Sequence, residues 1–157
     1  MNQAILFFAT GAYLSYLPGW ALSKVGRVQK RGGEGFLGSL EGLFLSLIMP
    51  KNARIFLMVI VLASLIAFWV CGQAEKILGR HDDGRIILDE ILGMMLAAFL
   101  LPHTVKAYLL ALVLFRVFDM FKVFPCNWFE KLPGGYGVVF DDLCAGVMAN
   151  LAAHLFV

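Results

Sequence analysis

The chain has 157 residues, of which 61% are hydrophobic and only 15% are charged. Soluble domains carry about 25% charged residues, so this composition excludes an ordinary soluble enzyme and a disordered chain. The net charge of +2 is too small for the dense basic face of a nucleic-acid-binding protein. We therefore predict a single membrane domain over residues 1–157, with an N-terminal apolar segment and basic loop (residues 1–34) followed by a helical core (residues 35–157).

The first apolar segment, residues 4–23, is uncharged but contains Gly11, Pro18 and Gly19. Because a Pro-Gly break disfavours a clean crossing of the bilayer, we predict a re-entrant or interfacial segment here. The basic stretch Lys24–Arg31 follows it and suits anionic lipid headgroups.

Five further apolar segments are separated by breaks rich in proline and glycine. A helix needs about 20 apolar residues to cross a bilayer, and open sheets are not stable in lipid. We therefore predict an all-α, polytopic membrane helix bundle with about five spans. The predicted spans are Phe36–Met49, Ile55–Ala74, Ile86–Leu101, Val105–Phe121 and Val138–Val157.

Threading these five spans through a bilayer sorts the charged residues onto one side. Ten of the thirteen lysines and arginines fall on the side where Phe36 enters, and the positive-inside rule makes that side cytoplasmic. Ten of the eleven acidic residues also fall there, while Glu41 lies about a turn into the first span. We therefore expect a multi-pass protein whose functional site faces the cytoplasm.

Three acidic clusters lie near the cytoplasmic ends of three predicted spans. Asp89-Glu90 opens the third span, Asp119 closes the fourth, and Asp141-Asp142 opens the fifth. Any one of these acids could simply stabilise a helix end through the macrodipole. Several converging carboxylates instead require positive charge, which a hard divalent ion such as Mg²⁺ supplies, so the convergence favours a functional site.

Arg116, Asp119 and Lys122 are spaced three residues apart and therefore share one face of a helix. Arg116 and Lys122 suit a phosphate, because arginine can bind it through two hydrogen bonds and lysine acts as a point charge. The pair Arg116 and Asp119 could alternatively be a simple salt bridge between helices. His81, which precedes the third span, could be a metal ligand, a general acid or a phosphate contact.

Two loop acids and the cysteines are expected to have no role in the site. The loop acids Asp83 and Glu130 are expected to be solvated. The cysteines lack the spacing of a metal site and are expected to behave as small apolar residues; they are Cys71, Cys126 and Cys144. No P-loop pattern occurs, and no arginine lies six residues after a cysteine, which excludes a cysteine-based phosphatase loop.

Five short motifs follow one another over about half of the chain: His81-Asp82-x-Gly84, Asp89-Glu90 with Gly93, Phe115-Arg116-x-x-Asp119-x-x-Lys122-x-x-Pro125, Gly134-Gly135-x-Gly137, and Asp141-Asp142-x-x-Ala145-Gly146. As an ordered set they resemble the phosphatidylglycerophosphatase A family. The resemblance implies a Mg²⁺-dependent phosphatase of the bacterial cytoplasmic (inner) membrane. Such an enzyme removes the terminal phosphate of phosphatidylglycerophosphate, an anionic phospholipid, and yields phosphatidylglycerol and phosphate for phospholipid biosynthesis.

On this basis we divide the candidate residues between metal binding and catalysis. The predicted Mg²⁺ ligands are Asp89, Glu90, Asp141 and Asp142. The groups predicted to bind phosphate or transfer protons are His81, Asp82, Arg116, Asp119 and Lys122. Direct attack by water is favoured over a phospho-enzyme, because no isolated nucleophile pattern is present.

The segment Glu34–Ser39 corresponds to the Pro-Gly-Thr-x-Gly-Ser segment of the family, with Phe36 in place of threonine. Because of this difference, one alternative is that the chain is a non-catalytic lipid-binding scaffold with the fold of the family. A second alternative is an enzyme resembling CDP-alcohol phosphotransferases, but Ile87-Leu88 occupy the Ala-Arg positions of that pattern. A third is a divalent-cation transporter. Such a protein should place acidic residues near the midplane of the membrane and often has inverted repeats, and the sequence shows neither feature.

Overall fold

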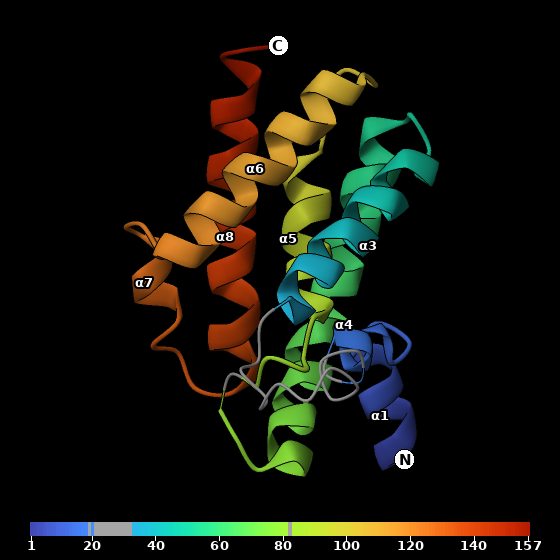
Figure 1. The fold of residues 1–157 in the computed structure, drawn as a ribbon, viewed down its shortest axis with the longest axis vertical. Coiled ribbons are helices and arrows are strands. Elements are labelled where there is room, and N and C mark those ends of the chain that lie inside the picture. The colour runs from blue at the N-terminus through green and yellow to red at the C-terminus, as the bar shows by residue number, and fades with distance from the viewer. Residues whose placement is uncertain (19, 21–32, 82) are drawn as a thin grey trace.

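A computed structural model describes residues 1–18, 20, 33–81 and 83–157. Within these residues every element is helical and none is a strand, which confirms the all-α prediction (Figure 1). The basic stretch Lys24–Arg31 and Asp82 lie outside the described residues. The elements in chain order are α1 (Asn2–Ala9), η1 (Leu14–Tyr16), α3 (Glu34–Ile48), α4 (Ala53–Leu78), α5 (Leu88–Ala97), α6 (Val105–Phe121), α7 (Cys126–Phe129) and α8 (Gly135–His154).

Helix α4 has 26 residues and well-defined ends. The Asn52 side chain accepts hydrogen bonds from the backbone N–H groups of Arg54 and Ile55, and Gly79 ends the helix in the left-handed conformation with a φ of 71°. Among the described helices, α4 and the 20-residue α8 are long and apolar enough to cross a membrane. Two such helices are weak support for membrane association by themselves.

The prediction of five spans is not confirmed. Helices α3, α5 and α6 have 15, 10 and 17 residues, fewer than the about 20 that a crossing needs. The predicted span Ile86–Leu101 contains only the ten residues of α5, and this helix contacts α3, α4, α6 and α8. Five consecutive residues, Ile91–Met95, are buried, so α5 is the central helix of the bundle (Figure 1).

The N-terminal segment breaks earlier than the Pro-Gly pair suggested. Gly11, Ala12 and Tyr13 all have positive φ angles, of 54°, 52° and 67°, and they turn the chain between α1 and η1. Helix α1 has only eight residues, too few to cross a bilayer, and it packs against α4. Residues 19 and 21–23 of the predicted segment lie outside the described part of the chain.

Backbone contacts at glycines hold the central helices together. A Cβ atom at Gly146 of α8 would collide with the carbonyl oxygen of Gly93 in α5. A Cβ atom at Gly42 of α3 would collide with the carbonyl oxygen of Ile91 on another side of α5. Such small-residue contacts allow helix backbones to approach closely, and they fix how far α5 lies from both neighbours.

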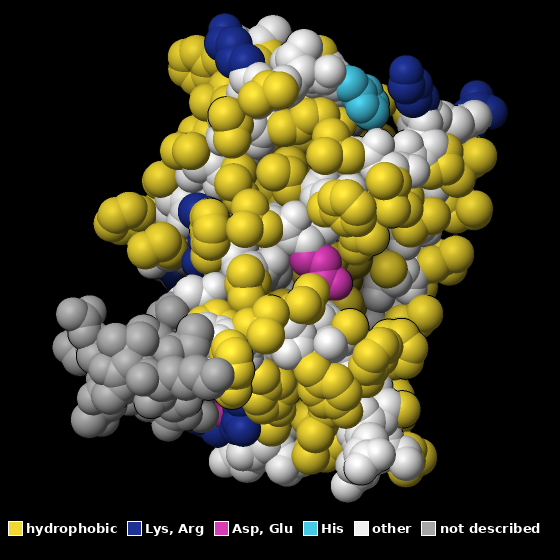
Figure 2. All heavy atoms as spheres, turned by 45° about the vertical axis from the view of Figure 1, so that its right-hand side comes forward, with side chains coloured by type: hydrophobic (Ala, Val, Ile, Leu, Met, Phe, Trp, Pro, Cys, Tyr) yellow, Lys and Arg dark blue, Asp and Glu magenta, His cyan; other side chains and the backbone are white. Residues whose placement is uncertain are grey.

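The outer surface of the bundle is strongly apolar. Figure 2 shows hydrophobic side chains covering the middle of one face, with lysine and arginine side chains at its upper end and along its left edge. Seven large apolar side chains of α4 are each 43–63% exposed: Leu57, Met58, Val61, Leu62, Leu65, Ile66 and Trp69. A contiguous exposed apolar face is unusual for a soluble monomer and, like the two candidate spans, suggests membrane association.

The glycine contact between α5 and α8 leads to a testable prediction. Replacing Gly146 with alanine should lower the free energy of unfolding by about 1–3 kcal/mol, because the new methyl group must push one backbone away from the other. Thermal unfolding of the purified protein in detergent measures this effect. The Gly84→Ala variant is the control, because a Cβ atom there would meet only Glu34 Oε2, at 3.9 Å. Equal melting temperatures for the two variants would contradict the prediction.

Candidate active site

Three predicted carboxylates come together between α5 and α8. Asp89 and Glu90 lie in the first turn of α5, and Asp142 lies in the second turn of α8. One ligand oxygen from each residue can be chosen so that all three lie within 4.8 Å of one another. Asp89 and Asp142 are buried and Glu90 is half-buried. We call these three residues the acidic triad.

The glycine crossing places the triad. Asp89 precedes Gly93 by four residues and Asp142 precedes Gly146 by four, so each acid lies about one turn from the point where the backbones meet. Helix α8 begins at Gly135 rather than at the expected Val138. Asp142 is therefore well inside the helix, and the alternative that it only stabilises the helix end does not apply.

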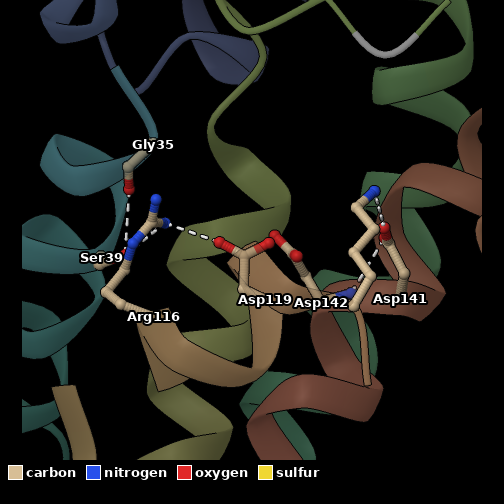
Figure 3. Close-up of polar contacts among 7 residues, drawn as sticks. Gly35, Ser39, Arg116, Asp119, Asp141 and Asp142 are labelled. Carbon is tan, nitrogen blue, oxygen red and sulfur yellow. Dashed lines mark hydrogen bonds and ion pairs between the residues drawn. The ribbon is translucent and has the colours of Figure 1, made fainter. Parts of the chain in front are cut away.

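Arg116 connects the triad to α3. Its Nη1 lies 2.9 Å from Asp119 Oδ2 and donates a hydrogen bond of 3.2 Å to Ser39 Oγ, which donates in turn to the carbonyl oxygen of Gly35 at 3.0 Å. The carboxyl group of Asp119 lies within hydrogen-bonding reach of Asp142 (Figure 3). A continuous polar path therefore runs from α3 through Arg116 and Asp119 to the triad.

Gly35 leaves room for Glu90. A Cβ atom at this position would collide with Glu90 Oε1 and would lie 3.3 Å from Arg116 Nη1. The sequence pattern predicted no role for Gly35 or Ser39 beyond their place in the family-like segment. Their four-residue spacing, which places both on one face of α3, is the signal that could have identified them.

Asp141 and Lys122 form a separate group beside the triad. Lys122 Nζ lies 2.9 Å from Asp141 Oδ2 and 2.8 Å from Glu130 Oε1. Adjacent residues on a helix diverge by about 100°, so Asp141 points toward Lys122 while Asp142 points toward α5. Asp141, which was predicted to be a metal ligand, is therefore not part of the triad. Lys122, which was predicted to bind phosphate, instead forms ion pairs with two carboxylates. Glu130, expected to be solvated, is one of them.

The predicted histidine also has a different partner. His81 Nδ1 lies 2.6 Å from Glu75 Oε1, and the His81 side chain is 58% exposed. Asp82 lies outside the described residues. Asp83, expected to be solvated, is instead buried and accepts hydrogen bonds of 2.8 Å from Nε and Nη2 of Arg85. That contact raises the pKa of the Arg85 guanidinium, and the ion pair braces the loop before α5.

The triad suits a hard divalent cation. Its three residues offer only carboxylate oxygens, the ligand type that Mg²⁺ prefers. Glu90 Oε2 is buried and has no hydrogen-bond partner among the described residues. Several ionised carboxylates held together away from water are unstable unless positive charge compensates them. The donor set and the unsatisfied oxygen therefore both fit a bound cation.

Comparisons with known proteins identify the family of this chain. A family model described as Phosphatidylglycerophosphatase A matches residues 7–157. The chain belongs to this family. It is similar to Phosphatidylglycerophosphatase A of Escherichia coli (strain K12), with 34% identity over 120 residues, which cover 73% of this chain and 69% of that protein. It is also similar to the protein of the same name from Haemophilus influenzae, with 35% identity over 119 residues and 73% of each chain covered. No solved structure matches it.

Membership of this family confirms the resemblance that the ordered motifs indicated. The chain is therefore an enzyme of a phosphatase family whose named members act in lipid metabolism. All five motifs lie within the matched residues, and they supply both the triad and the crossing glycines.

Gly35 provides a test of the site that leaves the fold intact. In Gly35→Ala the new methyl group meets the flexible end of Glu90, so the carboxylate can move aside without displacing a backbone. We expect phosphatase activity to fall about 100-fold, because a misplacement of about 1 Å in an active site has this effect. The free energy of unfolding should change by less than about 1 kcal/mol. Activity equal to that of the unmodified protein would show that the position of Glu90 is unimportant.

Proposed function

We propose that this chain is a Mg²⁺-dependent lipid phosphate phosphatase of phospholipid biosynthesis. Its substrate would be phosphatidylglycerophosphate, and its products phosphatidylglycerol and inorganic phosphate. The observation that carries the proposal is the buried acidic triad with Arg116 beside it, in a chain of the phosphatidylglycerophosphatase A family.

Asp89, Glu90 and Asp142 would hold the metal ion. When bound, Mg²⁺ supplies a Lewis acid that polarises phosphoryl oxygens and favours the ionisation of water. Each of the three residues contributes an oxygen from the same small cluster, and Glu90 Oε2 is the buried atom that a cation would satisfy.

Arg116 would bind the phosphoryl group of the substrate. Ser39 and Asp119 hold its guanidinium from two sides, so little side-chain freedom is lost when a phosphate binds. In hydrolysis, the oxygen of water forms a bond to phosphorus as the ester oxygen leaves, and negative charge lies on the equatorial oxygens in the transition state. The positive charge of Arg116 would stabilise that distribution.

Asp119 is the better-placed proton-transfer group of those that the sequence suggested. It lies between Arg116 and Asp142, whereas His81 is paired with Glu75 of α4. Asp119 would accept a proton from the attacking water as the bond between phosphorus and the ester oxygen breaks, and that proton would pass to the ester oxygen, which leaves as the alcohol of phosphatidylglycerol. Lys122 would act through Asp141, holding this part of α8 in position.

The location that we propose is the bacterial cytoplasmic (inner) membrane, with several crossings and the site on the cytoplasmic side. The supporting observations are the exposed apolar surface and the sorting of ten of thirteen basic residues onto one side in the five-span threading. Helices α3, α5 and α6 would then cross only part of the bilayer, or the bilayer would be thinner around them.

Phosphate release from phosphatidylglycerophosphate tests this function. Purified protein in detergent should release phosphate with Mg²⁺ and none with EDTA. Asp89→Asn and Asp142→Asn should each lower kcat at least about 100-fold, because each removes a charged oxygen ligand. Titration calorimetry with Mg²⁺ should show the same two variants losing the metal, which gives a readout that is independent of turnover.

The control variant is Glu130→Gln, which alters a carboxylate outside the triad and should leave both readouts unchanged. Activity that survives EDTA, or full activity in both asparagine variants, would contradict the mechanism. Mg²⁺ flux into protein-containing liposomes without phosphate release would instead favour the transporter alternative.

A further inference from the structure

An apolar groove lies between α3 and α6 and reaches the candidate active site. It has a volume of about 490 Å³, within the range of small-molecule sites. Its walls include Phe36 from α3 and Val113, Val117 and Met120 from α6. Arg116 is the one charged side chain among the described residues that line it.

The groove and the site share Arg116. Val113, Val117 and Met120 are spaced by four and three residues, so they form one face of α6, and Arg116 lies on the same face. Arg116 lines the groove, and its guanidinium lies 2.9 Å from Asp119, whose carboxyl group reaches Asp142 of the triad. A molecule in the groove would therefore lie beside the residue whose guanidinium we propose to bind phosphate.

The groove walls are open to an occupant. Phe36 is 47% exposed, Val113 58% and Met120 69%, so these apolar side chains lack covering groups among the described residues. The occupant must be apolar along its length and anionic where it meets Arg116. A lipid phosphate meets both requirements, because its acyl chain is apolar and its headgroup is anionic. A soluble phosphate ester would leave the apolar walls uncovered.

We propose that the groove between α3 and α6 binds an acyl chain of the lipid phosphate substrate, placing its phosphate at Arg116. This inference rests on the proposed function. It makes Phe36, Val113 and Met120 the residues that determine how tightly long acyl chains bind. It also predicts that the enzyme distinguishes lipid phosphates by their chains as well as by their headgroups.

Filling the groove tests this proposal. Val113→Trp should raise KM for dioleoyl phosphatidylglycerophosphate by at least about tenfold, because the indole occupies space that the chain needs. The kcat/KM for the dihexanoyl form of the same substrate should change less than about twofold, since its short chains extend little into the groove. The matched control is Val61→Trp on α4, a valine of similar exposure (50%) that does not line the groove, and it should leave both substrates unaffected.

The outcomes separate the groove from the function. Equal KM values for Val113→Trp and Val61→Trp would overturn the acyl-chain proposal, as would an equal loss for both substrates in Val113→Trp, which indicates damage at Arg116. A wild-type protein that hydrolyses neither substrate would overturn the proposed function.

In that case the groove is tested directly by a dioleoyl-type phosphatidate carrying a photoreactive group on one acyl chain. Mass spectrometry should find the adduct on peptides of α3 and α6, reduced by excess unlabelled phosphatidate but not by diacylglycerol. Adducts distributed evenly over the exposed apolar surface would overturn the proposal. Cross-links between the α6 helices of two copies would also overturn it, by assigning the groove to a second copy of the chain.

Discussion

The backbone contact between α5 and α8 is the constraint on which the candidate site depends. Gly93 and Gly146 meet with no side chain between them, and a Cβ atom at Gly93 would lie only 2.7 Å from the carbonyl oxygen of Asp142. Packed helices ordinarily lie about 8–10 Å apart, with the distance set by the side chains at the contact. Larger residues at the crossing would separate Asp89 from Asp142, and oxygens from two helices could no longer share one cation.

The close approach creates an electrostatic cost that the surroundings must offset. Two further carboxylates, those of Glu90 and Asp119, lie beside the buried pair. Arg116 supplies one positive charge, and the remaining imbalance is what a divalent cation would correct. The second acidic group differs, because Lys122 pairs with both Asp141 and Glu130. Two neighbouring clusters of similar composition therefore differ: the charges of one are compensated within the chain, and a bound cation would compensate those of the other.

Local patterns in the sequence predicted much of this arrangement, and distant contacts account for the rest. The bounds of α6 match the predicted Val105–Phe121: the Thr104 side chain accepts a hydrogen bond from the Ala107 backbone N–H at its start, and Lys122 ends it in the left-handed conformation. The contact between Arg116 and Asp119 follows from their three-residue spacing. Which member of the pair Asp141 and Asp142 faces α5 depends on the rotation of α8, which packing sets. Gly134 and Gly135 fall in one of the predicted breaks between spans, yet Gly135 packs against α4 so closely that only glycine fits, and the helix begins there.

Arg116 explains why an apolar chain and an acidic site occur in one small bundle. Its guanidinium is held by Ser39 and Asp119, while its long aliphatic stem lies along a groove with Val113 and Val117. A soluble phosphate ester would need only the triad and this guanidinium. The apolar walls add binding energy that depends on the acyl chain and on nothing in the headgroup. Arg116 lies where the groove and the triad meet, so a bound acyl chain and a bound terminal phosphate would restrict each other's position. The terminal phosphate ester bond, which is the bond that is hydrolysed, would then be held beside the carboxylates that we propose bind the metal.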